Sequence, residues 1–116
     1  MGTDSTKQVT DLTYLIELSK GNKEFVKDMI DIFFAESPGE VNSIEEGVNT
    51  CNYELIKSSS HKMRSTIPFV CLDKVIEKDL AEIEYLSGLR SDINKIKNLF
   101  LKVKEVHRKA IEELQN

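Results

Sequence analysis

Apolar residues that recur at three- and four-residue steps constrain the fold of this chain more than any other feature of the sequence. The last segment carries the longest such series: Ile93, Ile96, Leu99, Phe100, Val103, Val106, Ala110 and Leu114. Side chains at these steps share one face of an α-helix, whereas a half-buried β-strand would alternate apolar and polar residues. The sequence has no such alternation, and only five glycines and two prolines interrupt its 116 residues. Long amphipathic helices are therefore expected.

Residues typical of helix ends divide the chain into one short and four long helices. The short helix is expected from Asp11 to Lys20, where Gly21 ends it. The long helices are expected at 22–50, 52–68, 72–87 and 91–114, with Asn22, Asn52 and Ser91 as N-caps. Helices joined by such short connections pack as antiparallel neighbours. The expected fold is all-α: an up-down antiparallel four-helix bundle over residues 11–116, with a short N-terminal capping helix and a flexible tail at 1–10.

The stretch Ser37-Pro38-Gly39-Glu40 leaves one feature of the first long helix open. It fits a capping box with proline at the first helical position, which would start a new helix. The apolar series continues on both sides of it, which favours one long helix that kinks near Pro38.

Charge and cysteine content exclude several classes of protein. A net charge of −4 disfavours a nucleic-acid partner, which requires a basic face. Cys51 and Cys71 have no metal-like spacing, so we expect free thiols in a reducing cytoplasm. The start MGTDSTKQ has no apolar signal-peptide core, and the apolar run Met29–Ala35 is too short to span a bilayer. A cytoplasmic protein without membrane contact is expected.

Helical geometry places His61 away from the core of the bundle. The residues expected on the core face of its helix are Leu55, Ile56, Ser59, Met63, Thr66 and Ile67. With about 100° of rotation per residue, His61 falls about 240° from Leu55, almost opposite the centre of that face. Its expected neighbours on the solvent side are Lys57, Arg64, Ser65 and Pro68.

The residues around His61 favour some chemistries over others. A metal site would need another ligand one turn away, and Lys57 and Arg64 would repel the ion. A general base would need an orienting carboxylate and a cleft, and neither is expected on this face. A nucleophile that accepts an anionic group fits best, because the two cations would neutralise it. A solvated surface histidine without a function remains open as an alternative.

Three stretches of the sequence form a recognisable pattern in order. They are D-L-T-Y-L-I-E-L-S-K-G-N-K-E-F-V-K-D-M-I-D-I-F from Asp11, then S-P-G-E-V from Ser37, and S-H-K-M-R-S at 60–65. With them the chain resembles the histidine-containing phosphotransfer (HPt) domains of bacterial two-component phosphorelays: the last stretch resembles the family signature A-H-K-[LM]-[KR]-[GSP], the first the usual lead-in, and the second the continuation of the next helix. The resemblance covers nearly the whole chain in order.

This resemblance implies a role for several residues. His61 would accept a phosphoryl group through Nε2 from the aspartyl phosphate of one receiver domain and pass it to the aspartate of another. Arg64 would pair with phosphate oxygens, and Ser65 holds the family's small position, where glycine is commonest. The phosphate and partner surface would comprise Lys57, Ser58, Lys62 and Pro68, although Lys62 points elsewhere on the helix. Leu12, Leu15 and Ile16 would either form a docking surface or only cap the core.

Departures and rival classes complete the expectations. Pro68, Phe69 and Cys71 depart from the family pattern, which leaves the exact end of the histidine helix open. A dimerising kinase helix would have an acidic residue where Lys62 stands, and no ATP-binding glycine box follows. We therefore expect a monomeric phosphocarrier without kinase activity or bound metal, whose receiver partner supplies Mg²⁺. It would be free-standing or part of a hybrid sensor histidine kinase.

A helical module that only binds receiver domains is the alternative function. A metal-binding bundle would need inward-facing pairs of glutamate and histidine. His107 is interpreted instead as an ordinary helix residue, and Glu77, Glu82 and Glu84 as solvated charges.

Overall fold

The computed structural model describes residues 8–115, and all regular elements within that range are helices. Its elements in chain order are α1 (Leu12–Leu18), α2 (Lys23–Thr50), α3 (Tyr53–Thr66), the 3₁₀ helix η2 (Ile67–Val70), α4 (Asp73–Gly88) and α5 (Ile93–Gln115). The expected all-α class is confirmed. None of the helices in the described part of the chain is long and apolar enough to cross a membrane.

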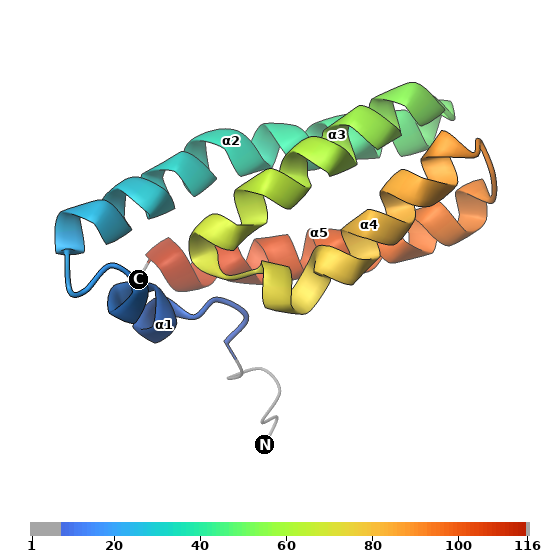
Figure 1. The fold of residues 1–116 in the computed structure, drawn as a ribbon. Coiled ribbons are helices and arrows are strands. Elements are labelled where there is room, and N and C mark those ends of the chain that lie inside the picture. Colours follow the sequence, from blue (N-terminus) through green and yellow to red (C-terminus); the bar gives the residue numbers. More distant parts are fainter. Residues whose placement is uncertain (1–7, 116) are drawn as a thin grey trace, which may run out of the picture.

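The four long helices form a bundle in which each runs back along the one before it (Figure 1). Helix α3 packs against both α2 and α4, α5 packs against α4, and α2 closes the bundle against α5. The short helix α1 lies across one end, close to the start of α2 and the end of α5 (Figure 1). This is the up-down arrangement that short connections dictate.

The apolar faces of the helices meet in one core. Its fully buried side chains come from every long helix and from η2, with Phe33, Ile44, Ile56, Met63, Ile67, Leu72, Ile76, Leu80, Ile83, Ile96 and Val103 as the largest among them. Burying a side chain of this size stabilises the fold by about 1.5–3 kcal/mol relative to an exposed one. The stripes read from the sequence are thus the faces that pack.

Polar side chains cap the starts of three of the four long helices, whereas α4 begins after Leu72 without a side-chain cap. The Asn22 and Asn52 amides accept hydrogen bonds from the backbone three residues on, as N-caps do. The prediction of Ser91 as the cap of the last helix was wrong. Asp92 accepts the hydrogen bond from the backbone of Lys95 at 3.1 Å, so the helix begins one residue later than that cap would allow.

One continuous helix runs through Pro38, which resolves the alternative left open above. Ser37 is fully buried and does not cap a new helix. Its hydroxyl lies 2.7 Å from the carbonyl of Phe33 in the preceding turn and 2.8 Å from Nε2 of His107 on α5. A serine bonded back into its own helix in this way continues the helix rather than starting one.

Helix α3 ends at Thr66, and Pro68 lies in the first turn of η2, which follows directly. The expected single helix to residue 68 is therefore an α-helix with a 3₁₀ extension. Cys71 ends η2 with a left-handed φ of 66°. Cys51 and Cys71 are both free thiols, the first exposed and the second buried.

The N-terminal segment is anchored to the end of α5, whereas a flexible tail was expected through residue 10. The carboxylate of Glu113 accepts hydrogen bonds from the backbone of Val9 at 2.8 Å and of Thr10 at 3.0 Å, and a third from the Thr10 hydroxyl at 2.6 Å. Val9 and Thr10 are therefore held against α5 in this structure. Residues 1–7 of the expected tail lie outside the described range.

Candidate functional site

His61 stands on the outer face of α3, where helical geometry placed it. Its side chain is 71% exposed, whereas Ile56, Ser60 and Met63 are fully buried on the opposite face of the helix. The Asn52 cap and the apolar stripe fix the rotation of α3 against the bundle. The histidine is therefore presented to solvent by a rigid element.

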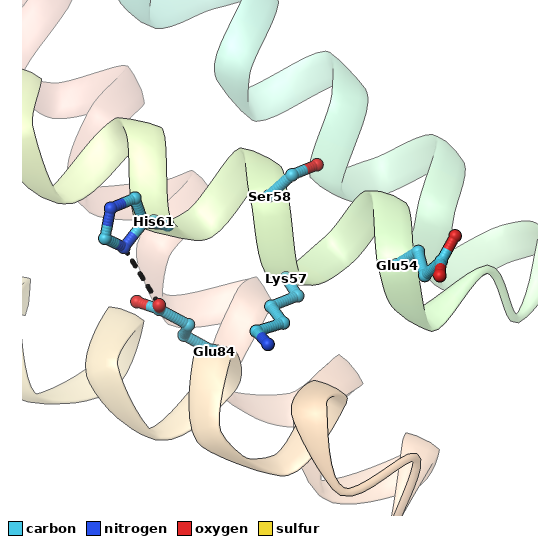
Figure 2. Close-up of a pocket in the computed structure, with 5 residues that line it drawn as sticks. All are labelled: Glu54, Lys57, Ser58, His61 and Glu84. Atoms are coloured by element: carbon cyan, nitrogen blue, oxygen red, sulfur yellow. Dashed lines mark hydrogen bonds and ion pairs between the residues drawn. The ribbon is translucent and has the colours of Figure 1, made fainter.

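A carboxylate from the neighbouring helix α4 binds the imidazole. His61 Nδ1 lies 2.9 Å from Oε2 of Glu84, whose side chain is only 18% exposed. Figure 2 shows the two side chains pointing toward each other from α3 and α4. Both predictions about this face were wrong: His61 does have an orienting carboxylate, and Glu84 is not a solvated charge.

Arg64 holds the other side of the same carboxylate. Its Nη1 donates to Oε1 of Glu84 at 2.8 Å, and its Nε and Nη2 lie 2.9 and 2.8 Å from Oε2 of Glu77. The carboxylates of Glu84 and Glu77 raise the pKa of the Arg64 guanidinium. Arg64 was expected to be available to phosphate oxygens, and in this structure two carboxylates contact all three of its nitrogens, which leaves a second N–H on each of Nη1 and Nη2.

The charge state of Glu84 follows from these contacts. Partial burial by itself raises the pKa of Glu84, but the hydrogen bonds from Arg64 and His61 outweigh burial and hold that pKa below its ordinary value. Glu84 is thus a carboxylate at neutral pH. Because a carboxylate only accepts hydrogen bonds, the His61 Nδ1 atom carries the proton of this contact.

The imidazole opens into a shallow cleft of about 680 Å³ between α3 and α4. The cleft is lined by Glu54, Lys57, Ser58, His61 and Glu84, which are the side chains drawn in Figure 2. No cleft was expected on this face. Its walls are the exposed side chains of α3 and the side chain of Glu84 on α4.

The other predicted site residues divide between two faces of α3. Lys57 and Ser58 line the His61 cleft. Lys62 lines a separate cleft on the α2 side, together with Glu40 and Ser58. Its different direction is therefore confirmed.

Ser65 and Pro68 lie further along the same helix and its extension. Ser65 is exposed, and its hydroxyl donates to the carbonyl of Lys62 at 2.9 Å. Pro68 is exposed on η2. Neither residue lines the cleft at His61.

The proposed docking residues on α1 have unequal exposure. Leu15 is only 2% exposed and packs with Val26 and Cys71, so it caps the core and presents no docking surface. Leu12 is half-buried against the same cluster. Ile16 is 44% exposed and is the one of the three that a partner could contact.

Sequence reasoning missed Glu54 and Glu84 as parts of this site and misjudged His107. Glu77 and Glu84 stand seven residues apart, on one face of α4, and Arg64 follows His61 by three. Each spacing keeps its pair on one face of its own helix, and that was the available signal for a cross-helix cluster. His107 is only 9% exposed, and its Nε2 is hydrogen-bonded to the hydroxyl of Ser37. Burial lowers the pKa of His107 and keeps its imidazole neutral. It is therefore a buried core residue and not the ordinary helix residue that was expected.

Within residues 8–115, no group of three or more histidine, cysteine, aspartate or glutamate side chains is placed to hold a metal ion. No protein-family model, curated protein or solved structure matches the chain.

Proposed function

We propose that the protein is a phosphocarrier of a two-component phosphorelay, with His61 as its phosphoacceptor. The observation that carries this proposal is the state of the imidazole: it is exposed, and Nδ1 is bonded to Glu84. With the proton on Nδ1, the lone pair of the neutral ring lies on Nε2. A histidine in this state is an activated nucleophile that a partner's active site can reach.

The phosphoryl donor would be the aspartyl phosphate of a receiver domain, and the acceptor the aspartate of a second one. On this proposal the chain is no kinase, because the acyl phosphate already carries the energy for transfer. Mg²⁺ would come with the receiver domain. The HPt resemblance of the sequence around His61 supports this choice of partner.

Exposed apolar side chains at one end of the bundle support a protein partner. They lie on α1 and the first half of α2: Tyr14, Ile16, Leu18, Phe25 and Ile32. A contiguous patch of exposed apolar side chains would mark an interaction surface. We propose that a receiver domain contacts both this region and the face of α3 that carries His61.

The test compares the wild-type chain with His61→Gln after incubation with a phosphorylated receiver domain and Mg²⁺. An acid-labile, base-stable label on the wild type alone is the result expected for phosphohistidine at His61. If neither protein takes up label from several receivers while the receivers still bind, the chain is a binding-only helical module.

A further inference from the structure

The two cations that flank His61 on α3, Lys57 and Arg64, differ in their contacts with carboxylates. Arg64 has its guanidinium engaged by Glu77 and Glu84, at 2.8–2.9 Å. Lys57 makes no ion pair with any residue that the structure describes. It lines the His61 cleft, whereas Arg64 does not. Lys57 is thus the cation of the two that no described carboxylate holds, and it lies at the cleft that His61 also lines.

The neighbouring end of α4 leaves room for the lysine. A Cβ built on Gly88 would lie 3.7 Å from Cδ and Cε of Lys57 and 3.8 Å from its Nζ, in ordinary contact, so the end of the lysine side chain lies along this glycine. Its ammonium lies at the cleft beside Glu84 (Figure 2). A long side chain held by its stem can present its charge to an anion in the cleft.

Freeing Arg64 for a phosphate would disrupt the site. A guanidinium that turned all three nitrogens toward a phosphate would leave two carboxylates, and the side chain of Glu84 is only 18% exposed between its partners. Removing one partner of such a group leaves a poorly solvated charge, which is more costly than losing an exposed ion pair. The same motion would release the carboxylate that orients His61.

We propose that Lys57 is the cation that binds the phosphoryl group on His61, and that Arg64 acts only through Glu84, as a positioning residue for the imidazole. This division of roles rests on the proposed phosphocarrier function. It differs from the role that the sequence resemblance implies for Arg64.

The transfer step balances without a proton transfer inside the chain. The Nε2 lone pair forms the N–P bond while the P–O bond of the aspartyl phosphate breaks, and that electron pair returns to the receiver's carboxylate. Nδ1 keeps its proton, so the ring becomes a phosphoimidazolium. Glu84 is its counter-ion, and the Lys57 ammonium faces the phosphoryl oxygens. In onward transfer the N–P electron pair returns to Nε2, and the leaving group is a neutral imidazole.

The test of Lys57 uses phosphoramidate as a small phosphoryl donor, so that no partner surface is involved. Lys57→Gln is compared with Lys62→Gln, since both remove one exposed charge from α3 but only Lys57 lines the His61 cleft. We expect Lys57→Gln to label about fivefold more slowly, the loss of one charge contact near water, and Lys62→Gln to label at the wild-type rate. In ³¹P spectra, Lys57→Gln should raise the pKa of the phosphohistidine phosphoryl group.

The test of Arg64 follows the ring nitrogens of unphosphorylated His61 by ¹⁵N NMR. Glu84→Gln and Arg64→Gln should both shift the ring from the Nδ1–H tautomer toward a mixture. Arg64→Gln should leave the phosphoryl pKa at its wild-type value. If Arg64→Gln instead raises that pKa and Lys57→Gln matches Lys62→Gln, Arg64 is the phosphate ligand and the division is overturned.

These experiments distinguish a failure of the proposed phosphocarrier function from a failure of the role proposed for Lys57. A wild-type chain that takes no label from phosphoramidate, with the His61 tautomer intact, contradicts the phosphocarrier function, and the role of Lys57 falls with it. A chain that labels on His61 with equal rates in both lysine variants contradicts only the assignment of Lys57.

Discussion

His61 on α3 and Glu84 on α4 are joined across the bundle by a contact of 2.9 Å between Nδ1 and Oε2, and the same carboxylate accepts from Arg64 at 2.8 Å. Glu84 on α4 therefore contacts two side chains of α3 and has two roles. It orients the imidazole, and with Arg64 it ties α4 to α3. A substitution at this residue should affect both the chemistry of His61 and the stability of the fold.

We expect Glu84→Gln to lower the free energy of unfolding by about 1 kcal/mol, because it weakens a partly buried ion pair and leaves Arg64 with Glu77 alone. Glu82→Gln is the matched control on the same helix, since Glu82 has only a 3.4 Å contact with Lys95 and is 41% exposed. It should change stability by less than about 0.5 kcal/mol. Urea unfolding measures both, and equal effects would contradict a structural role for Glu84.

The fold could be predicted because its signals are local. Each helix carries its own apolar stripe, and asparagine caps such as Asn52 mark helix starts without reference to the rest of the chain. Boundaries were less secure where two candidates stood together, as Ser91 and Asp92 do. Only the side-chain geometry of the folded chain decides between such neighbours.

The site could be predicted only in part, for a physical reason. The exposure of His61 follows from the rotation of its own helix. Its contact with Glu84 depends on how far α4 slides along α3, and a shift of one turn would bring a different side chain beside the imidazole. The engagement of Arg64 depends on the same register. The side-chain contacts between α3 and α4 could therefore not be predicted from the sequence.

Two glycines of α2 make a matched pair for testing the packing of α2 against α3. A Cβ on Gly47 would lie 2.6 Å from Cγ1 of Ile56, with the Asn52 carbonyl at 3.2 Å, whereas one on Gly39 would meet nothing within 4 Å. Gly47→Ala should lower the free energy of unfolding by about 1–3 kcal/mol through overpacking. Gly39→Ala should raise it by about 0.5–1 kcal/mol, because alanine favours a helix. Thermal unfolding of both variants tests this, and a stabilising Gly47→Ala would contradict the close approach.

Glu40 is a buried carboxyl whose ionisation should oppose folding. It is 5% exposed, its Oε2 accepts from the Thr66 hydroxyl at 2.8 Å, and its Oε1 has no hydrogen-bond partner in the structure. Burial raises the pKa of Glu40. Between its unfolded and folded pKa values the folded state binds more protons, so Glu40 lowers stability as the pH rises through that interval.

Glu40→Gln should therefore stabilise the protein at neutral pH, because the neutral amide keeps the contact with Thr66 without a buried charge. The stabilisation should shrink as the pH falls through the raised pKa of the folded protein, and it should be lost below the unfolded carboxyl pKa of about 4.3. Urea unfolding of both proteins at several pH values measures the difference. Glu36→Gln, on the exposed side of the same helix, is the control and should show little change. A Glu40→Gln variant that is less stable at pH 7 would indicate that the carboxylate has a partner after all.

His107 should give the opposite dependence on pH. Its imidazole is buried, lies 2.8 Å from the Ser37 hydroxyl, and has its pKa lowered by burial. As the pH falls below about 6.5, the unfolded chain binds a proton that the folded chain excludes, so stability falls by up to about 1.4 kcal/mol per pH unit. His107→Gln removes this titration and should flatten the acid side of the stability profile, while His61→Gln should leave the fall in place. If His107→Gln instead kept the wild-type slope between pH 6.5 and 5, the buried imidazole would have to be protonated in the folded protein, and its Nδ1–H would need an acceptor in addition to the contact of Nε2 with Ser37.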